Sequence, residues 1–123
     1  MAKSEEAKLW ERIKKLKLNY HMFRVESATI NGIPDISGLG NEIYFWLELK
    51  ANDRMDYGIS KWQMNWLTEH NSKGGNAFIL LKPLKHKGLK LLRIESRSVK
   101  VVAEGEDNEL TLRLMLSRCV FPS

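Results

Sequence analysis

The apolar run of residues 43–47, followed at once by Glu48-Leu49-Lys50, is the feature that most constrains how this chain can fold. Five consecutive apolar residues are typical of a strand covered on both faces, so we expect a central strand over residues 43–50 in a sheet flanked by helices. Side chains alternate along a strand, which places Glu48 and Lys50 on one face and Leu49 on the other. Charged groups at the end of such a strand are costly to desolvate, which suggests that something binds there.

A second acid, Asp35, follows a proline thirteen residues before Glu48. Asn31-Gly32 is a strong hairpin signal, which predicts that the segment around Asp35 runs antiparallel to a strand over residues 20–27. Taken alone, an aspartate after proline is common in turns, and Glu48 with Lys50 could be an ion pair on a solvated sheet. Two acids and a lysine that converge on one point could instead hold a divalent cation and activate water for phosphodiester cleavage.

The other elements follow from periodicity and turn residues. Gly38, Gly40 and Asn41 predict a second turn. The region 108–118 alternates leucines like a strand, yet a cap at Asp107 or Asn108 favours a helix. Further elements are expected as helices over residues 4–17 and 60–71, and as strands over residues 77–82, 89–95 and 99–103. The fold class is therefore α/β, with a mixed sheet built from a helix, three antiparallel strands, a helix, a strand, and extra C-terminal strands and a helix.

Size and charge limit the possible classes of protein. The 123 residues favour one domain over residues 1–123, and a net charge of +5 suits a polyanionic partner. Cys119 is the single cysteine, which excludes an internal disulfide and fits a reducing compartment. No apolar run approaches the roughly 20 residues of a membrane span, and the N-terminus lacks the apolar core of a signal peptide. We expect a soluble, cytoplasmic protein with no membrane contact.

The pattern G-I-P-D-I-S-G, F-W-L-E-L-K-A, S-K-W-Q and G-G resembles the PD-(D/E)xK nuclease superfamily, which has the restriction-endonuclease-like fold. Its spacing is similar to that of the Holliday-junction resolvases and of the VRR-NUC group, whose compact phage-encoded members look most similar. The resemblance covers a core of about residues 6–82, and its most specific points are Pro34-Asp35, Glu48-x-Lys50 and Gln63. It does not extend to residues 83–123, whose role stays open between a dimer element, a substrate clamp and simple core.

The resemblance implies a site that can be transferred residue by residue. Asp35 and Glu48 would ligate Mg²⁺ or Mn²⁺, with the backbone carbonyl of Leu49 as a further ligand. Lys50 would position the attacking water and offset charge in the transition state. Gln63 matches the glutamine that the family places on the helix after the E-x-K strand. It also completes a capping box with the serine three residues earlier, and both roles can hold at once.

The family usually has one more acid, and two residues compete for that place. Glu26 ends the strand before the hairpin and would lie close to Asp35, unless it is an exposed acid paired with Arg24. Glu6 lies on the apolar stripe of the first helix and could face inward, unless it only complements the helix dipole. We favour Glu26, with Glu6 as the alternative.

Function follows from the acids together with the basic residues. Cations that could contact nucleic acid are Lys8, Arg12, Lys15, Arg54, Lys61, Lys85 and Lys87, although such residues often form only a solvated face. The main hypothesis is a metal-dependent DNA endonuclease of the structure-selective, Holliday-junction-resolving type. One small site cannot cut two strands symmetrically, so we expect a homodimer. The alternatives are a non-catalytic nucleic-acid-binding module on the same fold, and a small interaction protein that uses its tryptophans as a partner surface.

Overall fold

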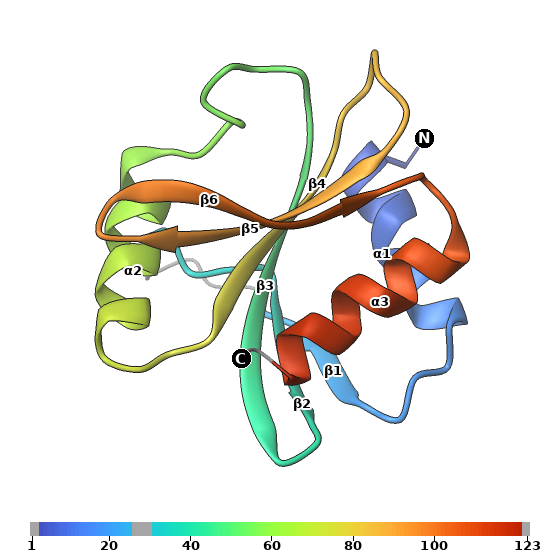
Figure 1. The fold of residues 1–123 in the computed structure, drawn as a ribbon, viewed down its shortest axis with the longest axis horizontal. Coiled ribbons are helices and arrows are strands. Elements are labelled where there is room, and N and C mark those ends of the chain that lie inside the picture. The colour runs from blue at the N-terminus through green and yellow to red at the C-terminus, as the bar shows by residue number, and fades with distance from the viewer. Residues whose placement is uncertain (1–2, 26–30, 122–123) are drawn as a thin grey trace.

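In the computed structural model, which describes residues 3–25 and 31–121, six strands form one sheet in the order of the chain (Figure 1). The elements are α1 (Glu5–Lys15), β1 (His21–Arg24), β2 (Ile36–Gly40), β3 (Ile43–Ala51), α2 (Lys61–Ser72), β4 (Ala77–Lys82), β5 (Leu89–Glu95), β6 (Ser98–Gly105) and α3 (Glu109–Val120). β3 and β4 are parallel, and every other neighbouring pair is antiparallel. The predicted α/β class with a mixed sheet is confirmed, and the order helix, three antiparallel strands, helix, strand is that of a restriction-endonuclease-like fold.

The parallel pair decides where the functional residues meet. Parallel neighbours need a long crossover connection, which α2 supplies between β3 and β4. Ser60 caps the start of α2, and Gly74 follows its C-cap with a φ of 87°, in the left-handed region that glycine adopts readily. The carboxyl ends of β3 and β4 therefore lie at the same edge of the sheet.

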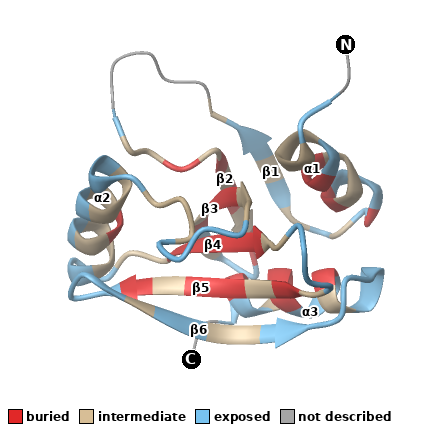
Figure 2. Ribbon diagram, turned by 90° about the horizontal axis from the view of Figure 1, so that it is seen from above, coloured by how far each residue is buried: buried red, intermediate tan, exposed pale blue. Residues whose placement is uncertain are grey.

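The two faces of the sheet are covered by different helices. α1 and α3 pack on one face and α2 on the other (Figures 1 and 2). Along β3, Phe45, Leu47 and Leu49 belong to the core under α1 and α3, while Trp46 packs on the α2 side. The alternation predicted for β3 is confirmed, because Glu48 lies on the opposite face from Leu49. Figure 2 shows the buried residues in the central strands and the exposed ones along the edge strands β1 and β6.

Residues 83–121 complete the core. β5 and β6 extend the sheet beyond β4, and Leu89 and Leu91 of β5 are fully buried. The helix predicted over residues 108–118 is confirmed as α3, and the side chain of Asn108 accepts a hydrogen bond from the Thr111 amide at its start. Cys119 is buried in the same core. Of the three roles considered for this segment, the structure supports a core element.

The prediction of a turn at Gly38 and Gly40 was wrong. Both glycines lie inside β2, and the turn is made by Asn41 and Glu42 alone, with φ of 51° and 61°. A Cβ at Gly38 would collide with the ring of Phe45 on the neighbouring strand, so this glycine makes room for an aromatic side chain. β1 is shorter than the strand predicted over residues 20–27, and Glu26 lies outside the described residues. None of the helices in the described residues is long and apolar enough to cross a membrane.

Candidate active site

The candidate site lies at the carboxyl end of β3, which extends beyond Ile36, the first residue of its antiparallel neighbour β2. β2 pairs with β3 only as far as Leu47, so the amides beyond it on that side lack a strand partner. Asp35 and Glu6 take the place of the missing strand. The Leu49 amide donates to Asp35 Oδ2 at 3.2 Å, and the Ala51 amide donates to Glu6 Oε2 at 3.1 Å. Because a buried amide without a partner is costly, these contacts fix both carboxylates along one edge of β3.

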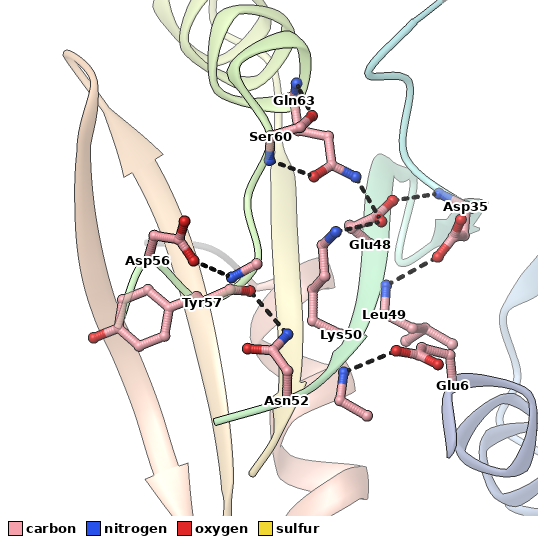
Figure 3. A network of polar contacts seen from close by, with 12 residues as sticks. Glu6, Asp35, Glu48, Leu49, Lys50, Asn52, Asp56, Tyr57, Ser60 and Gln63 are labelled. Atoms are coloured by element: carbon pink, nitrogen blue, oxygen red, sulfur yellow. Dashed lines mark hydrogen bonds and ion pairs between the residues drawn. The ribbon is translucent and has the colours of Figure 1, made fainter. Parts of the chain in front are cut away.

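Glu48 is the centre of the polar network drawn in Figure 3. Its Oε1 accepts a hydrogen bond from the Asp35 amide at 3.1 Å, and its Oε2 accepts one from Gln63 Nε2 at 2.9 Å. Lys50 Nζ lies 3.6 Å from the same Oε2. The Glu48 residue is only 6% exposed, so this is not an ion pair on a solvated sheet face. The structure thus brings Asp35, Glu48 and Lys50 to one place at the end of β3.

Gln63 forms the predicted capping box and also contacts Glu48. Its Oε1 accepts from the Ser60 amide at 3.0 Å, and its own amide donates to Ser60 Oγ at 3.1 Å, which completes the capping box of α2. Because the carboxamide oxygen is held by Ser60, the NH₂ group must point the other way, toward Glu48. The start of α2 therefore orients the Glu48 carboxylate.

The electrostatics of this place disfavour the charged form of both carboxylates. Burial, followed by the charge of Asp35, raises the pKa of Glu48 from its ordinary 4.5 to about 7. Burial also raises the pKa of Asp35, although the hydrogen bond from the Leu49 amide acts in the opposite direction. Asp35 and Glu48 are desolvated and Asp35 also lies near the acid Glu6, whereas the cations that act on these carboxylates are Lys50 and Arg24, so negative charge is in excess. Carboxylate oxygens are the ligands that Mg²⁺ and Mn²⁺ prefer, and this donor set therefore fits the expected cation.

The groups that would hold such an ion are Asp35, Glu48 and the carbonyl of Leu49. In extended backbone the N–H and C=O of one residue point to the same side, so the Leu49 carbonyl faces the edge where its amide meets Asp35. Of the two competing acids, Glu6 is the one that lies in the described residues, and it contacts the amide two residues further along, about 7 Å away. Within residues 3–25 and 31–121, no three His, Cys, Asp or Glu side chains come close enough to hold a metal.

Arg24 is a site residue that the sequence reasoning missed. It was considered only as a partner of Glu26, yet it lies near enough to Asp35 for its charge to lower the pKa of that carboxyl. Arg24 pairs with Ile36 at the end of β1, and the Val25 amide donates to the Asp35 carbonyl at 2.7 Å. The hairpin predicted from Asn31-Gly32 places the segments of Arg24 and Asp35 side by side, so it could have identified Arg24 as a neighbour of Asp35.

The cations predicted to bind nucleic acid fall into two groups. Three of them already have an acidic partner: Lys8 with Glu5, Arg12 with Asp107, and Arg54 with Asp56. The other four are exposed and form no ion pair within the described part of the chain: Lys15, Lys61, Lys85 and Lys87. The second group is therefore the better candidate for contact with phosphate.

No protein-family model matches the chain, and no curated protein matches its sequence. Among solved structures, it is similar to Hjc, a Holliday junction resolvase from the archaeal hyperthermophile Archaeoglobus fulgidus. The two share 16% sequence identity, the match covers 93% of this chain and 97% of that one, and the TM-score is 0.47. At this level of similarity, function has to be argued from the site itself.

Proposed function

We propose that this chain is a metal-dependent DNA endonuclease that hydrolyses phosphodiester bonds. The observation that carries the proposal is the meeting of Asp35, Glu48 and Lys50 at the end of β3, with the pKa of Glu48 raised to about 7. Strongly perturbed carboxylates beside a lysine are typical of functional sites. A bound Mg²⁺ or Mn²⁺ would polarise the phosphoryl oxygen and activate water.

The residues around the acids have distinct proposed roles. The Lys50 side chain is 16% exposed, so its ammonium can reach a bound phosphate and offset the charge that develops during hydrolysis. Asp35 and Glu48 would be the carboxylate ligands, each already oriented by a backbone amide. Gln63 is a positioning residue, because it acts through the Glu48 carboxylate. Glu6 or Glu26 would be the third acid.

DNA is the proposed substrate because of charge. The chain carries a net charge of +5, and exposed lysines occupy the edge where β3 and β4 end: Lys61 starts α2, while Lys85 and Lys87 follow β4. We extend the proposal to branched DNA, cut in the manner of a Holliday-junction-resolving enzyme. Symmetric cleavage of two strands requires two sites, so the active form would be a homodimer.

A cleavage assay tests this proposal. Labelled four-way junctions, flaps and linear duplexes are mixed with the protein in Mg²⁺ or in chelator. We expect Asp35→Ala and Lys50→Ala to reduce the cleavage rate by about 10²–10³-fold while the variants stay folded. Glu69→Ala is the matched control, because Glu69 is an exposed acid of α2 paired only with Lys73, and it should cleave normally.

Cleavage that survives both Asp35→Ala and Lys50→Ala would reject the assignment. Salt-dependent DNA binding by the unmodified chain without any cleavage in Mg²⁺ or Mn²⁺ would instead support the non-catalytic binding module.

A further inference from the structure

The loops that leave β3 and β4 are fastened together by one side chain. Asp53 Oδ1 accepts hydrogen bonds from the amides of Leu84 at 2.9 Å and of Lys85 at 3.1 Å. These bonds also hold the pKa of Asp53 below its usual range. Residues 52–58 and 83–88, here called the two-loop platform, therefore form one surface at the edge of the sheet that carries the candidate active site.

The first loop of the two-loop platform is held in one shape by its own hydrogen bonds. Asn52 Nδ2 donates to the Tyr57 carbonyl at 3.1 Å, and the Gly58 amide donates to Asp56 Oδ1 at 2.9 Å. Figure 3 shows Asn52 and Tyr57 directly beside Lys50. A loop that is fixed in this way presents its tip in a defined position next to the site, at a low entropic cost of binding.

The tips of the two-loop platform carry exposed apolar side chains. Met55 is 99% exposed and Leu84 is 53% exposed. Each stands singly among polar residues, whereas an interface for a folded protein needs a contiguous apolar patch. Proteins that bend DNA frequently insert single apolar side chains, Leu and Met among them, between base steps.

The charge around these tips favours a polyanion. The two loops themselves carry the cations Arg54, Lys85 and Lys87, against Asp53 and Asp56. Both aspartates are already occupied, Asp53 by backbone amides and Asp56 by a two-point contact with Arg54. Lys85 and Lys87 have no acidic partner in the described segments, so their charge is available to phosphates.

We propose that Met55 and Leu84 each act as an apolar wedge that inserts between neighbouring bases of DNA at a branched or distorted step, while Lys85 and Lys87 bind the flanking phosphates. This rests on the proposed function, since it assumes that DNA is the substrate, and it adds a physical basis for structure selectivity. Unstacking a base step costs a few kcal/mol, and less where pairing is already interrupted. A wedge therefore favours branched DNA over intact duplex.

The test measures unstacking in the absence of cleavage. A four-way junction with 2-aminopurine at the branch point is titrated with the protein in chelator, and we expect a severalfold rise in fluorescence on binding. The double substitution Met55→Ser with Leu84→Ser should abolish the rise and reduce the preference for junction over duplex about tenfold. The matched control is Leu110→Ser with Leu114→Ser, two leucines of α3 that are 66% and 58% exposed, and it should behave like the unmodified chain.

Two results of these measurements would overturn the wedge, and the first of them would leave the nuclease assignment standing. Metal-dependent cleavage without any rise in fluorescence overturns the wedge and leaves the nuclease assignment standing. A rise that persists in the Met55→Ser and Leu84→Ser variant also overturns it. In support, Lys85→Ala and Lys87→Ala should weaken junction and duplex binding alike and each reduce the salt dependence by about one phosphate contact, without removing the fluorescence rise.

Discussion

Partly buried charged groups lie near both ends of β3, but they are neutralised by partners at only one of them. At the amino end, the guanidinium of Arg93 donates to the Gly75 carbonyl at 2.9 Å and to Asn76 Oδ1 at 3.3 Å, and it pairs with Glu95 at 3.2 Å. The same group lies 5.4 Å from the centre of the Phe78 ring. At the carboxyl end, the acids Asp35, Glu48 and Glu6 outnumber the cations Lys50 and Arg24, and the pKa of Asp35 and of Glu48 is raised.

This difference separates a network that stability alone explains from the network to which we assign the proposed function. Around Arg93 each charge has its complement, and stability alone explains the arrangement. Around Glu48 the folded chain bears a cost that hydrophobic residues of similar size would avoid, which is expected where binding or catalysis needs the charge. A cleft of about 990 Å³ opens at the amino end, beside Tyr44 and Trp46, so the size of a cavity does not by itself mark the site here.

The largest expected effect is a loss of stability with rising pH in metal-free buffer. The pKa of Glu48 is about 7 in the folded chain and ordinarily 4.5, so the folded state binds this proton more tightly. The stabilisation is complete below pH 4.5 and is lost as the pH rises through 7, which corresponds to about 3 kcal/mol. Urea unfolding at a series of pH values between 4.5 and 8 measures it.

Glu48→Gln should remove this fall, because an amide does not titrate. The comparison between the two proteins is needed because burial lowers the pKa of His70, which makes stability rise with pH over part of the same range. Glu69→Gln, a change of an exposed acid, should keep the pH dependence of the unmodified chain. Parallel curves for the unmodified chain and Glu48→Gln would show that Glu48 is not strained, and the contrast between the ends of β3 would disappear.

The second effect concerns the amino end. Arg93→Ala removes a cation whose side chain is 19% exposed and leaves the Gly75 carbonyl and Asn76 Oδ1 without their donor. We expect the free energy of unfolding to fall by about 2 kcal/mol, while cleavage per folded molecule is unchanged. Arg97→Ala, at an exposed arginine with one hydrogen bond to Asn65, should change stability by about 0.5 kcal/mol or less. A loss of cleavage in folded Arg93→Ala would show that the amino end is also functional.

The same contrast explains how far the sequence could predict the molecule. The order of elements and the opposite facing of Glu48 and Leu49 follow from local periodicity, which the structure confirms. The contact between Glu6 and the Ala51 amide could not be predicted, because it exists only where β3 extends beyond its pairing with β2. That offset is a property of strand register, and no local pattern in the sequence reports it.

The glycines of β2 show a second limit. Glycines such as Gly38 and Gly40 occur in turns, and they also occur in strands that pass close to an aromatic ring. The local sequence is the same in both cases. Only the pairing with β3 decides between the two, because it brings Phe45 against Gly38. The orientation of Gln63, in contrast, depends on a local pattern. Its capping box with Ser60 fixes the carboxamide oxygen, so the NH₂ group points toward Glu48.

The smallest effect is the response to the metal itself. With free Mg²⁺ at ten times its dissociation constant, binding to the folded chain should stabilise it by about 1.4 kcal/mol, visible as a rise in melting temperature at pH 8. The gain should shrink below pH 7, because protons compete for Glu48 and a ligand must be deprotonated. Glu48→Ala should lose the response and Glu69→Ala should keep it. An equal rise in all three proteins would mean that Mg²⁺ binds elsewhere, and the excess negative charge at the end of β3 would then need another explanation than a metal.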